Sequence, residues 1–309
     1  MISALTMAAA LLVDHWLGEP RRAHPLVGYG RWANWLEKHL RQPSWPPLAL
    51  TLSGLLAVVI AVVPLALACS WLVSLPVVGL LLSLLLLYLC IGQRSLLDHA
   101  RAVATPLLAG DLIAARQAVA MMVSRDCRQL DSAGVARAAV ESVLENGNDA
   151  TVGALFWFAV GGAPAAVAYR LINCLDAMWG YRNPRFRHFG WAAARLDDLV
   201  NLLPARLTVL LYALAGDTRT ALRCAHHQGH LAKSPNGGPV MAAGAGALNL
   251  SVGGGASYGG HWLPQPVLGA GPTVTAADIE RAGALVQRTL VLGVSGWLLL
   301  SALCMLLQE

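Results

Sequence analysis

Long apolar runs are the feature that most restricts how this 309-residue chain can fold. A helix needs about 20 consecutive apolar residues to cross a bilayer. Only 13% of the residues are charged, whereas soluble domains carry about 25%. The chain is therefore predicted to be an all-α, polytopic membrane protein that forms a single membrane domain over residues 1–309. Its membrane helices are expected at about 1–17, 47–73, 75–92, 199–215 and 284–307.

The distribution of positive charge predicts which loops face the cytoplasm. Basic residues gather in 19–46 and resume at Arg94, whereas the turn near Ser74 is uncharged. Because cytoplasmic loops carry the excess of Lys and Arg, we expect 19–46 and a helical segment, 94–150, to be cytoplasmic and the N-terminus to lie outside. A short amphipathic helix over 31–40 is expected on the membrane surface. The net charge of +5 beside apolar runs fits topology and anionic substrates better than nucleic acid.

The apolar run 151–179 is interrupted by Gly161, Gly162 and Pro164. Each half is too short to cross a bilayer alone. Broken helices at membrane depth occur only where protein or a cavity surrounds them. We therefore predict a broken, re-entrant helical hairpin with both ends on the cytoplasmic side. Asn173 and Asp176 in its second half either face a site or lie at the surface.

Acidic and amide side chains gather between residues 141 and 149. Glu141 and Glu145 are four positions apart and stack on one face of a helix, which the turn signal at 146–148 is expected to end. Asp149 follows and is expected to share the carboxylates' pocket. Polar groups beside a membrane-like run are costly unless they are used, so Glu145, Asn146 and Asp149 are predicted to belong to a site. The alternative is that this acidic helix face is simply solvated. For Glu141 taken alone, a solvated face and a site are equally good explanations.

Further polar residues lie within apolar sequence downstream. Asp197 and Asn201 share a helix face. Arg206 lies inside an apolar run, where it needs a partner or an anion unless it reaches the membrane interface. His226, His227 and His230 form either a metal cluster or a basic loop, and we favour the basic loop because no acidic or cysteine partner is near.

The segment 234–260 is expected to be a glycine-rich loop. Glycine lets backbone N–H groups approach a phosphate closely. A flexible loop without a ligand explains the same composition equally well. The GxxxxGK[ST] pattern of a P-loop is absent from the sequence.

Taken in order, these motifs resemble the CobD/CbiB family, the adenosylcobinamide-phosphate synthases of cobalamin biosynthesis. The strongest blocks are 139–149 (A-V-E-S-V-x-E-N-x-x-D), 169–181 (Y-R-x-x-N-x-L-D-x-M-x-G-Y), 194–198 (A-R-L-D-D), 204–207 (P-A-R-L) and 234–236 (S-P-N). Others are 14–20 (D-x-x-L-G-E-P), 24–25, 30–31, 94–95, 110–111, 115–116 and 124–126. Their order over nearly the whole chain carries the resemblance, since no single block is decisive.

The family joins (R)-1-amino-2-propanol phosphate, or ethanolamine phosphate, to the free propionate carboxylate of adenosylcobyric acid. The resemblance therefore implies an amide-forming ligase in the cell inner membrane, with its active site on the cytoplasmic side. Its expected partners are this corrinoid substrate, the amino-alcohol phosphate and membrane lipid, with no nucleic acid. A homo-oligomer or a complex with other corrinoid enzymes is left open.

A carboxylate and an amine do not condense unaided in water, so the resemblance also implies ATP and Mg²⁺. The catalytic candidates are Glu145, Asn146, Asp149 and Asp176. The candidate metal ligands are Glu145, Asp149, Asp197 and Asp198. The candidate partners of substrate or phosphate are Arg125, Arg195, Arg206, Lys233, Ser234 and Asn236.

Some positions depart from the family pattern. Met241 stands where many relatives have a glutamate, so that glutamate is not an essential base here. Ala232 stands where a histidine is usual, and His230 is a candidate replacement. These departures affect what is expected of the chemistry of this loop, and they do not affect the resemblance to the family.

Two other classes remain, a small-molecule transporter and an AmpE-like membrane sensor. A transporter should carry its ionisable residues inside its spans, whereas most here lie in loops. A sensor should not need the acidic blocks and the Ser-Pro-Asn block together. Turnover of cobyric acid would separate an enzyme from both.

Overall fold

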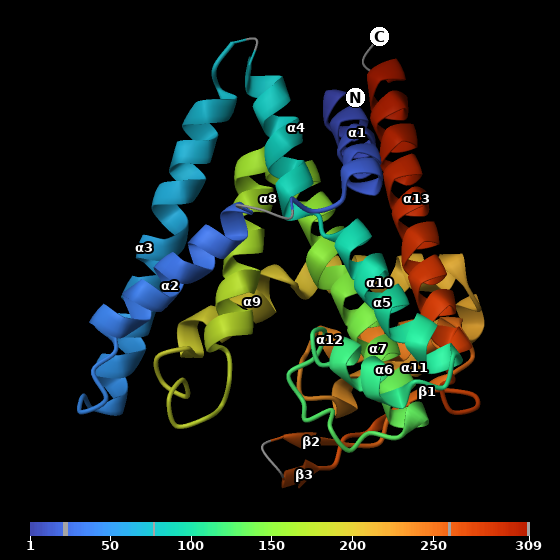
Figure 1. Ribbon diagram of the computed structural model, residues 1–309. Helices are drawn as coiled ribbons and strands as arrows, with labels where there is room; N and C mark the ends of the chain where they lie inside the picture. Colours follow the sequence, from blue (N-terminus) through green and yellow to red (C-terminus); the bar gives the residue numbers. More distant parts are fainter. Residues whose placement is uncertain (21–23, 77, 259–260, 308–309) are drawn as a thin grey trace. The chain divides into compact units, whose positions relative to one another are not determined.

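The computed structural model describes residues 1–20, 24–76, 78–258 and 261–307 (Figure 1). Arg21 and Arg22 of the predicted basic segment, and residues 259–260 of the predicted glycine-rich loop, lie outside the described residues. The chain divides into two compact units. Unit 1 comprises Met1–Gly92 and Gly153–Asn201, and unit 2 comprises Gln93–Val152 and Leu202–Glu309.

Apolar helices confirm the predicted all-α membrane architecture. Among the described residues, the helices long and apolar enough to cross a membrane are Pro47–Val73, Val78–Leu108, Ser132–Trp179 and Ala277–Leu306. The bent pair Trp191–Val200 and Leu202–Ala215 provides a fifth if it counts as one span. The predicted span 75–92 therefore lies largely within the longer stretch Val78–Leu108, whose second helix, from Gln93, carries the charged residues Arg94, Asp98 and Arg101. The predicted span 1–17 is the shorter apolar helix Ile2–Leu17.

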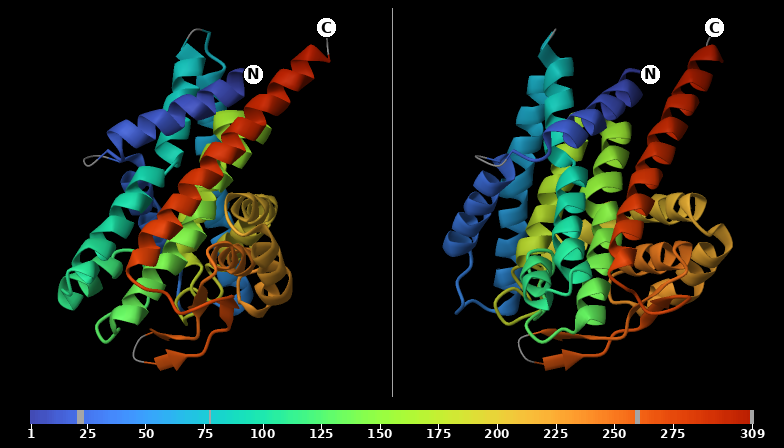
Figure 2. Two further views of the ribbon diagram at one scale, coloured as in Figure 1. Left: turned by 90° about the vertical axis from the view of Figure 1, so that its right-hand side faces the viewer. Right: turned by 45° about the vertical axis from the view of Figure 1, so that its right-hand side comes forward.

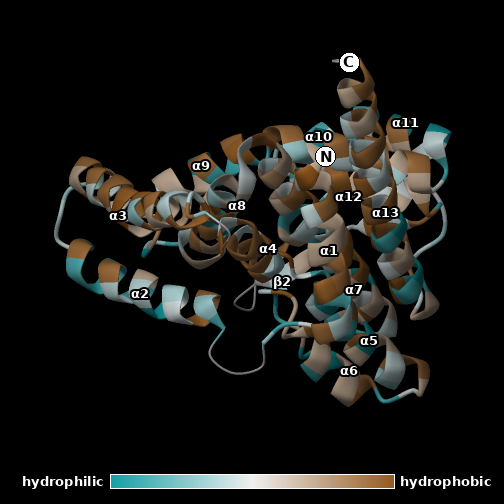
Figure 3. Ribbon diagram, turned by 90° about the horizontal axis from the view of Figure 1, so that it is seen from above, coloured by the Kyte–Doolittle hydropathy of each residue, from teal (hydrophilic) through white to brown (hydrophobic). Residues whose placement is uncertain are grey.

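Unit 1 is built around an apolar core between four helices. It contains α1 (Ile2–Leu17), α2 (Pro25–Leu40), α3 (Pro47–Val73), α4 (Val78–Cys90), α8 (Gly153–Trp179) and α9 (Trp191–Val200). Figure 3 shows α3 and α4 as mostly hydrophobic and α2 as mixed. The core lies between α2, α3, α8 and α9 and includes the fully buried Trp179 and Phe189, whose rings meet edge to face at 5.1 Å. The helix predicted over 31–40 begins earlier, because His24 accepts a hydrogen bond from the Leu26 N–H and Pro25 suits the first turn.

The predicted break in 151–179 is confirmed. Gly161 (φ −139°, ψ 19°) and Gly162 (φ 66°, ψ −163°) leave the helical region. A Cβ built on Gly153 would lie 2.1 Å from the Tyr169 hydroxyl, whereas a straight helix would separate these positions by about 24 Å. The chain therefore reverses at the two glycines, and the arms of α8 form a helical hairpin (Figure 2).

Gly162 is expected to tolerate no side chain. Its φ and ψ are accessible essentially to glycine alone, so Gly162→Ala should cost about 1–3 kcal/mol and lower the thermal midpoint in detergent. Gly296→Ala is the matched control, because a Cβ there meets nothing within 4 Å. Equal midpoints for the two variants would contradict the strained reversal.

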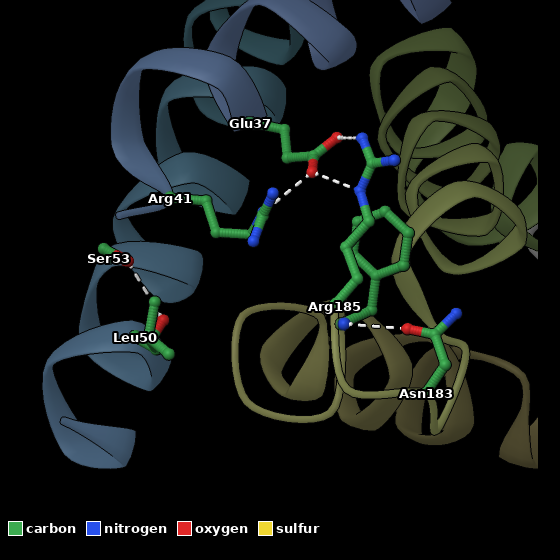
Figure 4. Close-up of polar contacts among 7 residues, drawn as sticks. Glu37, Arg41, Leu50, Ser53, Asn183 and Arg185 are labelled. Carbon is green, nitrogen blue, oxygen red and sulfur yellow. Dashed lines mark hydrogen bonds and ion pairs between the residues drawn. The ribbon is translucent and has the colours of Figure 1, made fainter. Parts of the chain in front are cut away.

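A buried carboxylate ties α2 to the loop between α8 and α9 (Figure 4). Glu37 is 3% exposed. It accepts hydrogen bonds from Nε and Nη2 of Arg185, both at 2.8 Å, and from Nε of Arg41 at 2.9 Å. Burial alone raises the pKa of Glu37, but the bonds and charges of Arg185 and Arg41 together outweigh it, so the pKa lies below its ordinary value.

This contact should stabilise the protein in a pH-dependent way. A depressed folded-state pKa adds stability above the unfolded-state pKa of about 4.3, and that stability is lost as the pH falls through the folded-state value. Glu37→Gln should cost about 1–3 kcal/mol near neutral pH, and less at about pH 3. Thermal midpoints in detergent at both pH values measure this, with the exposed Glu19→Gln as control. If Glu37→Gln lowers the thermal midpoint equally at both pH values, the charge of the carboxylate is not what stabilises the contact.

Unit 2 is organised around α7. It contains α5 (Gln93–Leu108), α6 (Leu112–Val119), α7 (Ser132–Gly147), α10 (Leu202–Ala215), α11 (Thr218–Gln228), α12 (Gly237–Ala247) and α13 (Ala277–Leu306). α7 packs against α5, α12 and α13. Asp111 and Asp131 cap α6 and α7: their carboxylates accept hydrogen bonds from the Ala114 and Gly134 N–H groups at 3.0 and 2.7 Å.

Four short strands complete unit 2. β1 (Ser251–Gly253) pairs antiparallel with β4 (Val267–Gly269), and β2 (Ala256–Tyr258) pairs antiparallel with β3 (His261–Leu263). The register places Val252 opposite Leu268. These strands bring the chain after α12 back to α7, since α7 contacts β1.

The turn predicted at 146–148 is wrong. α7 passes directly into a π-helical turn, Asn148–Val152, and then into α8. Bonds from α10 hold this junction: the Thr208 hydroxyl donates to Asn148 Oδ1, and the Tyr212 hydroxyl donates to the Leu144 carbonyl, both at 2.8 Å. Tertiary partners therefore keep helical a stretch that local sequence marks as a helix end. Single π turns of this kind are frequent at functional sites.

The predicted glycine-rich loop 234–260 is also wrong: α12 occupies Gly237–Ala247, and the short strands β1 and β2 lie in the part of the segment described after it. The small residues of α12 let neighbours approach closely. A Cβ on Gly244 would lie 2.6 Å from Leu144, and one on Gly246 would lie 2.9 Å from the Thr220 carbonyl. The small-residue run thus serves close helix packing against α7 and α11.

Candidate functional site

A cavity of about 380 Å³ in unit 2 gathers five of the predicted site residues. We call it the Glu145 cavity. It is lined by α7, by the segments 122–125 and 231–234, and by residues of β1 and the chain around β4. The predicted residues that line it are Arg125, Glu145, Asn146, Lys233 and Ser234. Blocks far apart in the sequence therefore meet at one site.

The Glu145 carboxylate lies beside the start of α12. A Cβ built on Gly237 would lie 2.7 Å from Glu145 Oε1. Ser234 Oγ accepts hydrogen bonds from the N–H groups of Asn236 and Gly237, at 3.3 and 2.9 Å. A helix N-terminus favours a negative charge, and Lys233 adds a cation to the same cavity. The fold thus places a carboxylate and an ammonium group together at the site.

Asn146 is oriented by α7 itself. Its Nδ2 donates to the Ser142 carbonyl at 2.9 Å and to Ser142 Oγ at 3.3 Å. Its amide oxygen has no hydrogen-bond donor among the described residues, and the side chain lines the cavity. Asn146 can therefore offer an oxygen to a ligand.

Glu141 is a buried structural carboxylate, so the solvated-face alternative is wrong for it. It is 4% exposed, accepts a 2.5 Å bond from Arg125 Nη2, and accepts a 2.6 Å bond from the Gly253 N–H. Arg125, predicted to bind substrate, is therefore paired with Glu141, and the pair adds no net charge to the cavity wall. The acidic side chains that line the described cavity are Glu141 and Glu145, which leaves Glu145 as the candidate for chemistry.

Arg206 fixes the Ser-Pro-Asn block. Its Nη1 donates to the Pro235 carbonyl at 3.0 Å and to Asn236 Oδ1 at 2.9 Å. Asn236 is buried at 4% exposure. Both acceptors are neutral, so these bonds position the guanidinium without balancing its charge.

Asp149 is not among the residues that line the Glu145 cavity. It lies in the π-helical turn, where Asn148 Nδ2 donates to its Oδ1 at 2.8 Å. Its catalytic role stays a prediction.

The remaining predicted residues lie in unit 1. Asp197 accepts hydrogen bonds from Asn201 Nδ2 at 3.2 Å and from Asn173 Nδ2 at 3.3 Å, which confirms that Asp197 and Asn201 share a face. Arg195 and Asp198 form an ion pair of 3.4 Å. The Asp176 carboxylate lies over Gly180, where a Cβ would come within 2.0 Å of its Oδ1.

The predicted metal ligands divide between the units, with Glu145 and Asp149 in unit 2 and Asp197 and Asp198 in unit 1. Within the described residues, no group of three or more His, Cys, Asp or Glu side chains could hold a metal ion. The metal assignment therefore stays a prediction.

Sequence reasoning missed several lining residues, notably Ser142 and Gln265. Ser142 could have been found, because it lies four positions before Asn146 on the same helix face. Gln265 could not, since only the strand pairing brings it to α7. Met241, noted above as a departure from the family pattern, also lines the cavity and gives it an uncharged side chain at that position.

The comparisons with known proteins are consistent over most of the chain. The family model described as CobD/Cbib protein matches residues 7–286. The cobalamin biosynthesis protein CobD of Chromobacterium violaceum is 53% identical over 294 residues, which cover 93% of each chain. Proteins of the same description are 54% identical over 299 residues in Stutzerimonas stutzeri, covering 96% of this chain and 95% of that one, and 42% identical over 308 residues in Rhodobacter capsulatus, covering 94% and 96%. No solved structure matches.

Proposed function

Because this chain belongs to the CobD/CbiB family of cobalamin biosynthesis, we propose that it joins an amino-alcohol phosphate to adenosylcobyric acid. The amine, (R)-1-amino-2-propanol phosphate or ethanolamine phosphate, forms an amide with the free propionate carboxylate. The product is adenosylcobinamide phosphate. The observation that carries the proposal is the Glu145 cavity, which combines a carboxylate, an ammonium group, an amide and a hydroxyl in one place.

Glu145 is proposed to hold the amine and take its proton. An amine is largely protonated near neutral pH and must lose a proton before it attacks a carbonyl carbon. A carboxylate binds the ammonium form and can accept that proton. Lys233, which lines the same cavity, is proposed to stabilise the negative charge that develops on the carbonyl oxygen during attack. Asn146 and Ser234 are proposed to orient the reacting groups.

ATP is the proposed source of driving force: transfer of its terminal phosphoryl group to the propionate carboxylate would give an acyl phosphate and ADP, and the amine would then displace phosphate from the carbonyl carbon. Mg²⁺ binds through one or two protein oxygens together with substrate phosphates and water. Asn146 and Glu145 would supply those protein oxygens to a Mg²⁺ ion bound together with the nucleotide. When bound, it neutralises charge on the phosphates. We also keep the proposed catalytic or metal-binding roles of four acidic residues outside this cavity, namely Asp149, Asp176, Asp197 and Asp198.

We place the reaction at the cytoplasmic face of the cell inner membrane. The support is the clustering of Lys and Arg in 19–46 and after Arg94, beside apolar helices. In a cysteine-free variant, an impermeant thiol reagent on whole cells should label a cysteine placed at residue 74 and not one at residue 38. The reverse pattern would invert the topology.

Complementation tests the proposed function in cells. A strain that lacks its own family member should regain cobalamin synthesis from adenosylcobyric acid when it expresses this chain. Supplying adenosylcobinamide phosphate should bypass the requirement. If the chain is present in the membrane and only the bypass restores growth, the protein does not perform this step.

A further inference from the structure

A second cavity of about 780 Å³ adjoins the Glu145 cavity within unit 2. It lies between α10, α11 and the segment 229–239, and Ala232 and Lys233 line both cavities. Its ionisable lining residues are Arg206, His226, His230 and Lys233. None of its lining residues in the described chain is acidic. We call it the basic cavity.

The Arg206 charge is positioned but not balanced. Nη1 makes both of its hydrogen bonds, to the Pro235 carbonyl and to Asn236 Oδ1. Nε and Nη2 have no hydrogen-bond acceptor among the described residues. A guanidinium that is held by one nitrogen and has two others without acceptors suits an oxyanion, which it can bind through paired bonds.

Two histidines extend the cationic wall. His226 lies in the last turn of α11, and His230 lies in the following 3₁₀ turn, Gly229–Leu231. Both line the basic cavity. Each imidazole can donate an N–H to an oxyanion in either charge state. The metal reading of this histidine segment has no support, since no third His, Cys, Asp or Glu completes a group among the described residues.

We propose that the basic cavity binds the phosphate group of a phosphate-bearing ligand through Arg206, Lys233, His226 and His230. Four donors without a counter-carboxylate match a phosphate dianion in charge and in hydrogen bonding. Lys233 borders both cavities, so the remainder of a small ligand can extend past it into the Glu145 cavity. That the ligand is the amino-alcohol phosphate rests on the proposed function, since its amine would then lie on the Glu145 side.

A phospholipid headgroup offers the same chemistry. Leu210 and Leu222 line the basic cavity and are 54% and 40% exposed, so an acyl chain has an apolar surface to lie on. The experiment therefore needs one arm for soluble phosphate and one for lipid.

The first arm titrates inorganic phosphate into the purified full chain in neutral detergent, followed by ³¹P NMR. The double variant His226→Gln/His230→Gln should bind about tenfold more weakly than the wild type. His227→Gln is the matched control, because His227 is an exposed neighbour on the same helix that does not line the cavity. It should bind as the wild type does.

The second arm compares co-flotation with vesicles of phosphatidylglycerol and of phosphatidylcholine. A loss confined to phosphatidylglycerol in the double variant, with inorganic phosphate binding unchanged, assigns the cavity to a lipid phosphate. Weaker inorganic phosphate binding with an unchanged lipid preference assigns it to a soluble phosphate. If the double variant matches the wild type in both arms, the cavity does not bind phosphate.

Turnover then separates this inference from the proposed function. If the amino-alcohol phosphate is the ligand, its KM should rise about tenfold in the double variant, with kcat within about twofold. A wild-type protein without amide turnover would contradict the proposed function, while the phosphate titration would still decide the cavity. An unchanged KM together with weaker phosphate binding would reject the amino-alcohol phosphate as the occupant.

Discussion

Replacing Glu145 by glutamine is expected to lower amide formation at least about a hundredfold, a loss of about 2.7 kcal/mol of transition-state stabilisation. Glutamine keeps the volume but neither attracts an ammonium group nor accepts a proton from it. Glu145 is the lining acid that remains once Glu141 is assigned to its ion pair with Arg125. The loss should appear in kcat for saturating substrates, because proton removal belongs to the chemical step.

The matched control is Glu280→Gln, the same substitution at an exposed carboxylate near the start of α13. It should leave both turnover and thermal midpoint unchanged. Glu145→Gln should also melt within a few degrees of the wild type, so that lost activity does not reflect unfolding. Normal turnover by Glu145→Gln would remove the carboxylate from the chemistry and place the reaction elsewhere.

Glu141→Ala should have the largest effect on stability, about 3–5 kcal/mol, because it removes the carboxylate that is ion-paired with a buried guanidinium. The side chains of Arg125 and Glu141 are 11% and 6% exposed. The substitution also removes the acceptor of the Gly253 N–H, which joins α7 to β1. Glu141→Gln should cost less, since its amide oxygen can still accept that bond.

A double-mutant cycle isolates the pair. The double variant Arg125→Met/Glu141→Ala should be less destabilised than the sum of the single variants, because both members of the ion pair are then removed together. Denaturation in detergent, followed by circular dichroism, measures all the members. Turnover per folded molecule should change far less in Glu141→Gln than in Glu145→Gln. Additive single effects would mean that the ion pair contributes no coupling energy.

Local sequence predicted those parts of the fold whose causes are local. The long apolar runs and the reversal at Gly161 and Gly162 each depend on a few neighbouring residues. The failures have tertiary causes. The turn predicted at 146–148 remains helical because α10 supplies bonds from Thr208 and Tyr212.

The candidate site likewise has features that the sequence predicted and features that only the folded structure shows. Family-like blocks identified Arg125, Glu145 and Ser234, and the structure gathers them around one cavity. Sequence did not show that Arg125 is paired with Glu141, because residues 125 and 141 meet only through the folding of unit 2. It likewise did not show that His226, His230 and Arg206 line one basic cavity, since α10 and α11 must first pack against each other.

The central claim is that this chain makes the amide bond itself. The most direct measurement incubates the purified protein in detergent with adenosylcobyric acid, an amino-alcohol phosphate, ATP and Mg²⁺, and identifies the corrinoid products by mass. We expect a corrinoid whose mass is that of the two substrates less one water, formed only when both are present and abolished when ATP is omitted. Recovery of unchanged adenosylcobyric acid from folded wild-type protein, with both amino-alcohol phosphates tried, would contradict the account.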